Sequence, residues 1–356
     1  MSVGTGSPTL PRTPAGEAPL LAVRDLHVSF ASPAGWIRAV NGVSFTLGAG
    51  QTLGIVGESG SGKSVTSRAI INLLPRHGTV RTGEVFLGDR DMLGLAKRDL
   101  RHALGGDVAL IPQHPKVSLN PVMTVGRQIT ETLRLHRGMA RRPARREAAD
   151  LLAAVGIPDP KRRLAEYPGQ MSGGMCQRVM IAIALAGQPM LLIADEPTTA
   201  LDVTIQAQIL DLLKAQQAER GMAMILITHD LNVAASYTDQ IAVMYAGRFV
   251  EFSSAREVFE AYRMPYTEAL LDAMPRLDSP LTAHLAAIDG EPPALVGLPP
   301  GCSFAARCRY VTEHCTRETP PLQAAGTSQH LYACWNPVRS ASPEPPTAVA
   351  NADCRH

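Results

Sequence analysis

The chain has 356 residues, and its 34 Lys and Arg nearly balance its 32 Asp and Glu, which leaves a formal charge of +2. This balance argues against a nucleic-acid-binding protein, which usually has a strongly basic domain. Hydrophobic residues make up 45% and charged residues 19% of the chain, so bulk disorder is excluded and a sizeable core is expected. The length predicts one large domain and a smaller one.

No run of about 18 uninterrupted apolar residues occurs, so we expect no membrane-spanning helix. Residues 1–17 are rich in Gly, Ser, Thr and Pro and lack the basic start and apolar stretch of a signal peptide. We therefore expect a flexible leader and a cytosolic chain. Residues 337–356 are rich in Pro, which predicts a disordered tail.

In chain order, the first expected strands are Leu21–Phe30, Ala39–Leu47 and Gly83–Leu87, whose alternation predicts an antiparallel edge sheet. Five other runs are short and apolar on both faces, which is typical of a parallel sheet covered by helices on both sides. They are Leu53–Val56, Val108–Ile111, Leu191–Ala194, Met224–Thr228 and Ile241–Tyr245. The expected fold class is therefore α/β.

Residues 122–165 have a helical pattern and hold a run of arginines: Arg134, Arg137, Arg141, Arg142, Arg145 and Arg146. Two interpretations stay open. The run is either a solvated helical face or a surface that contacts anionic lipid headgroups or a membrane partner.

Residues 57–64, GESGSGKS, fit the phosphate-loop pattern G-x-x-x-x-G-K-[ST], with the strand LGIV before them and a helix expected from Lys63. Glycines let successive backbone N–H groups turn toward phosphate oxygens, and the helix start adds a partial positive charge. We expect Lys63 to reach the β- and γ-phosphates and the Ser64 hydroxyl to bind Mg2+. The expected ATP-binding residues here are Gly57, Ser59, Gly60, Ser61, Gly62, Lys63, Ser64 and Val65.

The buried strand that begins at Met190 ends in two acids, Asp195 and Glu196. Beside a phosphate loop, Asp195 is predicted to hold Mg2+. Side chains alternate along a strand, so Glu196 is expected to point to the other side and to polarise the attacking water. Without the phosphate loop, a solvent-exposed strand end would be the better explanation of the pair.

The segment Met171–Met175, MSGGM, resembles the signature motif L-S-G-G-Q of ABC-type ATPases. Gln113 resembles the glutamine of the Q-loop, Ala200-Leu201-Asp202 the D-loop and His229 the switch histidine, all in the family's order. The resemblance covers residues 20–262. It implies an ABC-type P-loop NTPase with a parallel core sheet, an antiparallel β edge subdomain and a helical subdomain at about 114–176.

Longer segments resemble the ATP-binding subunits of oligopeptide and dipeptide ABC importers: PQHPKVSLNP, YPGQMSGGM, DEPTTALDVTIQAQIL, MPYTEALLDAMP and GEPPALVGLPPGCSFAARC. Val65-Thr66 and the run SRAIINLLP are similar to the first of that family's two paralogous ATPase subunits. Gly169 and Cys176 depart from the family's usual His and basic residue, outside the catalytic motifs. The implied parts are a nucleotide-binding domain at 18–262 and a small, loop-rich C-terminal domain at 263–336.

Ser172 is predicted to cap an apolar helix at 173–186, which leaves backbone N–H groups at the helix start free to bind an anion. In the family, Ser172, Gly173 and Gly174 would bind the γ-phosphate of ATP held by the partner subunit, so two chains close around two ATP molecules. The resemblance further implies that Gln113 contacts Mg2+, that His229 orients water with Glu196, and that Asp202 joins the ATP interface.

Adenine needs an aromatic platform, and only 4% of the residues are aromatic. Phe30 stands where the family has its stacking aromatic, and we favour it over Trp36. The alternative is that Phe30 packs within the edge sheet.

Four cysteines, Cys302, Cys308, Cys315 and Cys334, lie near prolines and glycines, and no C-x-x-C pair occurs among them. The usual structural zinc spacing is therefore missing, and four thiolates suit an iron–sulfur cluster. The resemblance implies a [4Fe-4S] cluster held by these four residues. Separate buried thiols or a zinc ion are the alternatives.

Together these features predict an ATPase that uses ATP and Mg2+ to power the uptake of peptides or related small solutes, at the cytoplasmic face of the membrane. The implied partners are two transmembrane permease subunits, a paralogous ATPase subunit or a second copy, and an extracytoplasmic solute-binding protein, but no nucleic acid. Two alternatives stay open: a soluble ABC ATPase, disfavoured because one phosphate loop and one signature occur, and an ATPase gated by redox chemistry of the cysteines.

Overall fold

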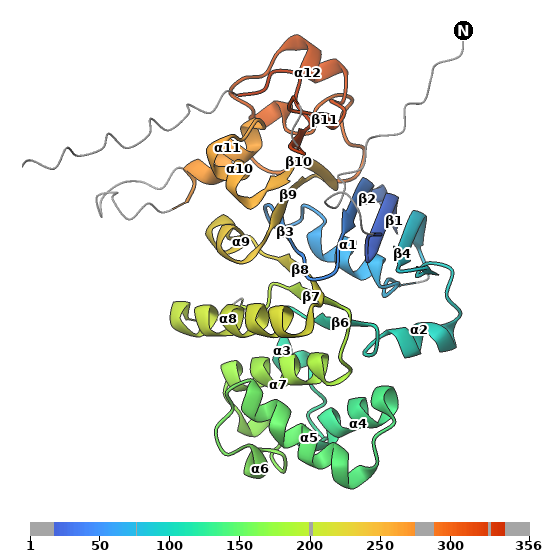
Figure 1. The fold of residues 1–356 in the computed structure, drawn as a ribbon. Helices are drawn as coiled ribbons and strands as arrows, with labels where there is room; N and C mark the ends of the chain where they lie inside the picture. Colours follow the sequence, from blue (N-terminus) through green and yellow to red (C-terminus); the bar gives the residue numbers. More distant parts are fainter. Residues whose placement is uncertain (1–17, 76, 199–201, 275–287, 327–328, 339–356) are drawn as a thin grey trace, which may run out of the picture.

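The computed structural model describes residues 18–75, 77–198, 202–274, 288–326 and 329–338. The leader predicted at 1–17 lies outside these residues, and so does the predicted tail apart from residues 337 and 338. Within the described ranges, the framework consists of a four-stranded and an eight-stranded sheet (Figure 1).

The four-stranded sheet is antiparallel and has the order β2-β1-β4-β5, with β1 Leu21–Ser32, β2 Gly35–Leu47, β4 Thr79–Leu87 and β5 Arg90–Asp91. The three strands predicted here are confirmed, but they form a sheet of their own. Its buried residues Val28, Val43 and Phe45 share one hydrophobic cluster with Leu53 and Ile55 of the core sheet. The small sheet is therefore held by the core.

The core sheet has the order β11-β12-β10-β9-β3-β8-β7-β6. Its five parallel strands are those predicted: β3 Thr52–Val56, β6 Val108–Ile111, β7 Leu191–Asp195, β8 Ala223–Ile227 and β9 Gln240–Tyr245. Leu192 and Ala194 face one hydrophobic cluster, and Leu191 and Ile193 face another. Since alternate residues point to opposite faces, both sides of the sheet are buried.

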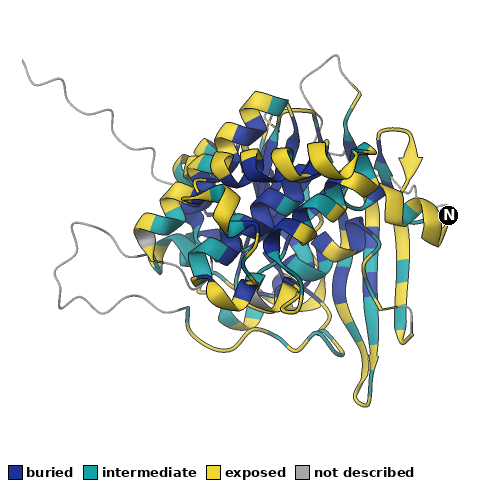
Figure 2. Ribbon diagram, turned by 90° about the horizontal axis from the view of Figure 1, so that it is seen from below, coloured by how far each residue is buried: buried dark blue, intermediate teal, exposed yellow. Residues whose placement is uncertain are grey.

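One face of the core sheet packs against α1 Lys63–Ile70 and the small sheet, and the other face packs against α7 Gly173–Ala186 and α8 Val203–Arg220. Two more helices flank the strands: α2 Lys97–Ala103 before β6, and α9 Leu231–Tyr237 after β8. Figure 2 shows the resulting pattern, in which buried residues fill the middle and exposed ones cover the outer helices. No helix of the described ranges is long and apolar enough to cross a bilayer.

Between β6 and β7 the chain forms a helical lobe at the end of the molecule opposite the C-terminal segment (Figure 1). Thr124 caps the first long helix through its side chain, and Gly138 ends it with φ 62°. The lobe is built of α3 Pro115–Ser118, α4 Val125–Arg137, α5 Arg141–Ala154, α6 Pro160–Arg163, η1 Pro168–Gln170 and the start of α7.

After β9, the strand β10 Arg248–Ser254 runs antiparallel to it and is followed by α10 Ala255–Glu260 and α11 Pro265–Asp272. The segment predicted as a small C-terminal domain, 263–336, adds two short strands to the core sheet, β12 Leu331–Tyr332 on β10 and β11 Gln323–Ala324 on β12. It also contains η2 Ala305–Arg307 and α12 Glu313–Arg317. We call residues 288–338 the C-terminal module.

A buried hydrogen bond between His330 and Glu251 fixes this module to the sheet. His330 Nε2 lies 2.7 Å from Glu251 Oε1, and the two side chains are 3% and 0% exposed. Glu251 also accepts the backbone N–H groups of Arg263 and Met264. The carboxylate is thus shared by β10, the loop before α11 and the module.

Candidate functional site

The phosphate loop, residues 57–64, joins β3 to α1. At Gly57 a Cβ atom would lie 2.2 Å from the carbonyl oxygen of Met244, and at Gly62 it would lie 2.3 Å from that of Ala39. Both glycines also have φ values in the left-handed range, 149° and 108°. Only glycine fits these two positions, so the loop is wrapped tightly against its neighbours.

The exposed tip of this loop is formed by Ser59 and Gly60, whereas Ser61 is buried. The Ser61 hydroxyl has no hydrogen-bond partner among the described residues. Val65 follows in the first turn of α1 and packs partly against the core. A buried hydroxyl without a partner is a donor that a phosphate oxygen would satisfy.

Lys63 is the buried cation at the centre of the loop. Its Nζ atom donates hydrogen bonds to the carbonyl oxygens of Gly57 at 2.7 Å and Glu58 at 2.8 Å. Burial lowers the pKa of Lys63, and the nearby Glu196, Asp195 and Glu58 carboxylates oppose that shift. The ammonium group is therefore held by oxygen atoms inside the loop.

Ser64 and Asp195 meet at the tip of β7. The Ser64 hydroxyl donates to Asp195 Oδ1 at 2.8 Å, and burial raises the pKa of this carboxyl against the opposing effects of Ser64 and Arg68. Asp195 Oδ2 has no hydrogen-bond partner in the described part of the chain and lies 4.0 Å from an Arg68 guanidinium nitrogen. A buried, unpartnered carboxylate oxygen beside a hydroxyl is a donor set that suits Mg2+.

Glu196 turns away from Asp195, but not for the predicted reason. The strand β7 ends at Asp195, and Glu196 has a left-handed φ of 49°. Its carboxylate accepts a hydrogen bond from Gln113 Nε2 at 2.8 Å and lies 3.6 Å from His229 Nδ1. Three residues predicted from three separate motifs therefore meet at one carboxylate.

The signature helix begins as the sequence predicts. The Ser172 hydroxyl accepts the backbone N–H of Met175, and α7 spans residues 173–186. Asp202 caps α8 in the same way by accepting the N–H of Ile205 at 2.9 Å. A Cβ atom at Gly174 would lie 3.5 Å from the Ile205 side chain, so the two helix starts are neighbours. Ala200 and Leu201 of the predicted D-loop lie outside the described residues.

The structure shows what surrounds each aromatic candidate. Phe30 pairs with Ile37 and Thr79 in the small sheet and packs partly against the core. Trp36 lies near the β1–β2 turn and is 50% exposed. The role of Phe30 as the adenine platform stays a prediction.

The four cysteines of the C-terminal module are free thiols, with Cys315 and Cys334 buried and Cys302 and Cys308 partly so. Burial, together with the other three thiols, raises the pKa of Cys334 to about 12. In the described ranges, however, no group of three or more His, Cys, Asp or Glu residues is arranged to hold a metal ion. Their role as cluster ligands stays a prediction.

Sequence reasoning missed the contacts that the C-terminal segment makes with the phosphate loop. Arg307 binds the Glu58 carboxylate through two guanidinium nitrogens, and the Tyr266 hydroxyl accepts the Glu58 backbone N–H. Glu58 occupies a variable position of the phosphate-loop pattern. Arg307 lies in a segment whose cysteines were its only predicted functional residues. No signal in the sequence connects the two.

A phosphate loop, an acid-tipped strand and a capped signature helix on this α/β fold define an ABC-type ATPase. The family model described as "ABC transporter" matches residues 40–199, and the one described as "Oligopeptide/dipeptide transporter, C-terminal region" matches residues 250–315. The chain belongs to the ATP-binding subunits of oligopeptide and dipeptide ABC transporters.

Two similar proteins of known type support this family assignment. The dipeptide transport ATP-binding protein DppD of Bacillus subtilis is 48% identical over 89% of this chain and 94% of its own length. The oligopeptide transport ATP-binding protein OppD of Salmonella typhimurium is 48% identical over 93% of this chain and 98% of its own length. A dimeric ATP-binding cassette, solved in a post-hydrolysis state with ADP and Pi, is 28% identical, with a TM-score of 0.60 over 66% of this chain and 99% of its own.

Proposed function

We propose that this ABC transporter ATPase powers the uptake of di- and oligopeptides or related small solutes from the cytoplasmic face of the membrane. The observation that carries the catalytic part is the contact of Glu196 with both Gln113 and His229, close to the Ser64–Asp195 pair. The peptide substrate is supported by the relatives, which are named for dipeptide and oligopeptide transport, and by the C-terminal match.

In this proposal the phosphate loop holds the β- and γ-phosphates of ATP, with Lys63 turning from its loop carbonyls to them. The bound Mg2+ would neutralise charge on these phosphates, held by Ser64, Gln113 and Asp195. The Glu196 carboxylate accepts a hydrogen bond from Gln113 and lies outside the Ser64–Asp195 pair, so it is the residue suited to take a proton from water. His229, 65% exposed at its side chain, would hold the γ-phosphate and align that water.

The starts of α7 and α8 would bind the ATP of a second nucleotide-binding subunit. In the described structure Ser172 and Asp202 satisfy one helix N–H each, so the remaining N–H groups of both helix starts can meet an anion. The second subunit would be a paralogue or another copy of this chain. ATP binding would then close the pair, and hydrolysis would open it.

The membrane part of the proposal comprises two transmembrane permease subunits and an extracytoplasmic solute-binding protein. The first test is purification of the tagged chain from membranes in mild detergent, followed by mass spectrometry of its companions. Two multi-span proteins and a related ATPase support the proposal. A chain that hydrolyses ATP but has no membrane companion contradicts the transport part and leaves the ATPase assignment intact.

We also propose that Cys302, Cys308, Cys315 and Cys334 hold a [4Fe-4S] cluster. Support comes from the set of four free cysteines within one module, and their side chains would have to turn toward a common centre to hold the cluster. Protein purified without oxygen should contain stoichiometric iron and sulfide. The variant Cys308→Ser should lose both, whereas Cys176→Ser, which alters a buried cysteine of α7, should keep them. Zinc instead of iron, or thiols that all react with an alkylating reagent, would refute the cluster.

A further inference from the structure

The first variable residue of the phosphate loop is fixed from three sides. The Glu58 carboxylate binds Arg307 at 2.7 and 2.9 Å, its backbone N–H donates to the Tyr266 hydroxyl at 2.9 Å, and its carbonyl accepts from Lys63. Two of these partners belong to the chain after β10 and lie more than 200 positions from Glu58. The C-terminal segment thus contacts the loop that we propose binds ATP.

Arg307 is built into this position with all its donors in use. Besides Glu58, its guanidinium group donates to the Tyr245 hydroxyl and to the backbone oxygens of Ile288 and Asp289. These five hydrogen bonds equal the number of N–H donors on a guanidinium group. The side chain is 4% exposed, and its hydrogen bonds to Glu58 raise the pKa of Arg307. A bidentate, nearly buried pair of this kind has one favoured geometry.

The arginine also lies between two of the four cysteines. It ends η2, and Cys308 follows directly, while Cys302 precedes η2 by three residues. Phe304 packs between Tyr245 and Tyr266, with ring centroids 5.3 Å from each. A shift of the segment 302–308 would therefore move the guanidinium group that holds Glu58.

We propose that Arg307 and Tyr266 are positioning residues that hold the phosphate loop in its ATP-binding shape, and that this links the cysteine segment to ATP affinity. The inference rests on the proposed role of the phosphate loop. Since linkage is reciprocal, ATP should in turn change the reactivity of Cys308.

The test measures the Kd for ATP, KM and kcat of full-length Arg307→Gln and Glu58→Gln. Each change should weaken ATP binding on the order of ten-fold, with a smaller effect on kcat, because the loop is misplaced while the catalytic carboxylate is not. The double variant should bind no more weakly than the weaker single, since both changes break one pair. Arg309→Gln removes an exposed arginine of the same module and is the matched control. Tyr266→Phe, which deletes only one hydroxyl, gives the same test with little risk to folding.

Unchanged affinity in Arg307→Gln and Tyr266→Phe, or strictly additive effects in the double variant, would overturn the inference. Lys63→Met separates this result from failure of the proposed function. If Lys63→Met loses ATP binding and Arg307→Gln does not, only the positioning role fails. If Lys63→Met binds ATP normally, the phosphate-loop assignment itself fails.

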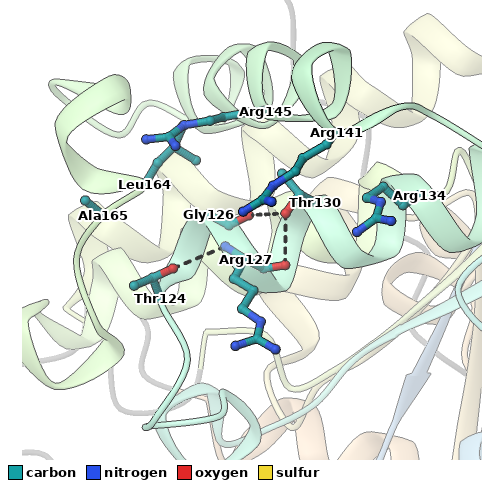
Figure 3. A pocket seen from close by; sticks show the side chains of 9 residues that line it. All are labelled: Thr124, Gly126, Arg127, Thr130, Arg134, Arg141, Arg145, Leu164 and Ala165. Atoms are coloured by element: carbon teal, nitrogen blue, oxygen red, sulfur yellow. Dashed lines mark hydrogen bonds between the residues drawn. The ribbon is translucent and has the colours of Figure 1, made fainter.

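A different part of the molecule carries an independent inference. The helical lobe has a hollow of about 560 Å³ lined by Arg127 and Arg134 of α4 and by Arg141 and Arg145 of α5, with Thr130 between them (Figure 3). In the described part of the chain, none of these four guanidinium groups forms an ion pair with a carboxylate. The neighbouring Arg137 does so, 2.7 Å from Glu147. We call this site the arginine hollow.

We infer that the arginine hollow binds anions that carry phosphate groups. Four guanidinium groups supply forked donors that match phosphate oxygens, and the volume is that of a ligand site. The arginine run therefore has two faces. All four arginines of α5 are exposed, but Arg141 and Arg145 line the hollow and Arg142 and Arg146 do not.

This difference supplies a matched pair of double variants. The test variant is Arg141→Gln/Arg145→Gln, and the control is Arg142→Gln/Arg146→Gln. Both are made in the Lys63→Met chain, so that the phosphate loop does not compete for the probe. The probes are inorganic tripolyphosphate and phosphatidylcholine vesicles containing phosphatidylglycerol. The first variant should lose about ten-fold or more in binding, and the second should stay within about two-fold. If the first variant alone loses binding of tripolyphosphate, the natural ligand is a soluble phosphate compound. If it alone loses binding of the vesicles, and tripolyphosphate does not bind, the ligand is a lipid headgroup. Equal loss in both variants, or no binding of either probe, would overturn the inference.

Discussion

At the scale of single residues, the decisive feature is the backbone of Glu196. A left-handed φ of 49° is uncommon for a residue with a long side chain, and such strain is worth about 1–3 kcal/mol. The backbone N–H of Glu196 still donates to Ile227 of β8 at 3.0 Å, so the sheet holds this conformation. The turn sends Asp195 toward Ser64 and Glu196 toward Gln113, and thereby separates the proposed magnesium ligand from the proposed general base.

The first prediction concerns this general base. Glu196→Gln keeps the shape of the side chain but cannot take a proton, so ATP should still bind while turnover falls at least about a hundred-fold. Equilibrium binding of ATP and steady-state phosphate release measure the two effects. Glu84→Gln, at an exposed acid of the small sheet, is the control and should turn over normally. Normal turnover of Glu196→Gln would remove this residue from the mechanism.

A second prediction concerns pH and His136, whose ring packs against the loop at residues 105 and 106. Burial lowers the pKa of His136, helped by His102, so the folded chain favours the neutral ring. The unfolded chain then takes up the proton first. Stability therefore begins to fall as the pH drops below the unfolded pKa of about 6.5, and it continues to fall until the pH passes the lower pKa of the folded chain. The melting temperature of the wild type should therefore fall more steeply on acidification than that of His136→Asn. Parallel curves for the two proteins would contradict the assignment.

Contacts between the defining residues of two motifs were predictable, and contacts that involve residues outside those defining positions were not. The Ser64–Asp195 contact follows from two motifs with known spacing on a parallel sheet. The Glu58–Arg307 pair joins positions 249 apart in the chain, and neither partner stands out locally. The direction of Glu196 was predicted for the wrong reason, because strand alternation was assumed where a left-handed turn occurs.

At the scale of elements, α7 was predicted to the residue because a strong N-cap precedes a long apolar run. The strand β2 was less predictable. It begins at Gly35, four residues before the predicted start, since the hairpin it forms with β1 is exposed and shows no alternation of burial. Element ends that face solvent carry little hydrophobic signal.

The cap of α7 gives a prediction at this scale. Ser172→Ala removes the hydroxyl that accepts the Met175 N–H and should lower the free energy of unfolding by about 1 kcal/mol. Ser254→Ala removes the equivalent cap of α10, remote from the ATP site, and should cost a similar amount. Only Ser172→Ala should also lower the ATPase activity of the assembled pair of subunits. Equal activity in the two variants would show that the α7 start is structural only.

At the scale of the whole molecule, the C-terminal module is joined to the core sheet. Its strands β11 and β12 are two residues long, which is too short for any periodicity to reveal them, so the sequence predicted the C-terminal domain without its strand pairing to the core sheet. His330 and Glu251 connect the module to β10 through a buried hydrogen bond, and leaving a buried polar group without its partner typically costs about 1–3 kcal/mol.

A chain ended after residue 322 should therefore be much less stable than the full chain, because it loses both strands and leaves Glu251 buried without its imidazole. A chain ended after residue 338 keeps every described contact and serves as the control. Urea unfolding of the three proteins tests this, with the midpoint as the readout. Equal midpoints for the chains ended at 322 and 338 would show that the module contributes nothing to the core.

The order of the core sheet has a consequence for synthesis on the ribosome. The strand β3 leads into the phosphate loop, yet its two neighbours, β8 and β9, lie at residues 223–245. The apolar strand β3 therefore stays unpaired during much of synthesis, and intermediates with unpaired apolar strands are prone to aggregate. A nascent chain therefore contains the complete phosphate loop long before both strands that flank β3 have been synthesised, which happens only in the last third of translation. This delay gives chaperones a defined interval in which to act.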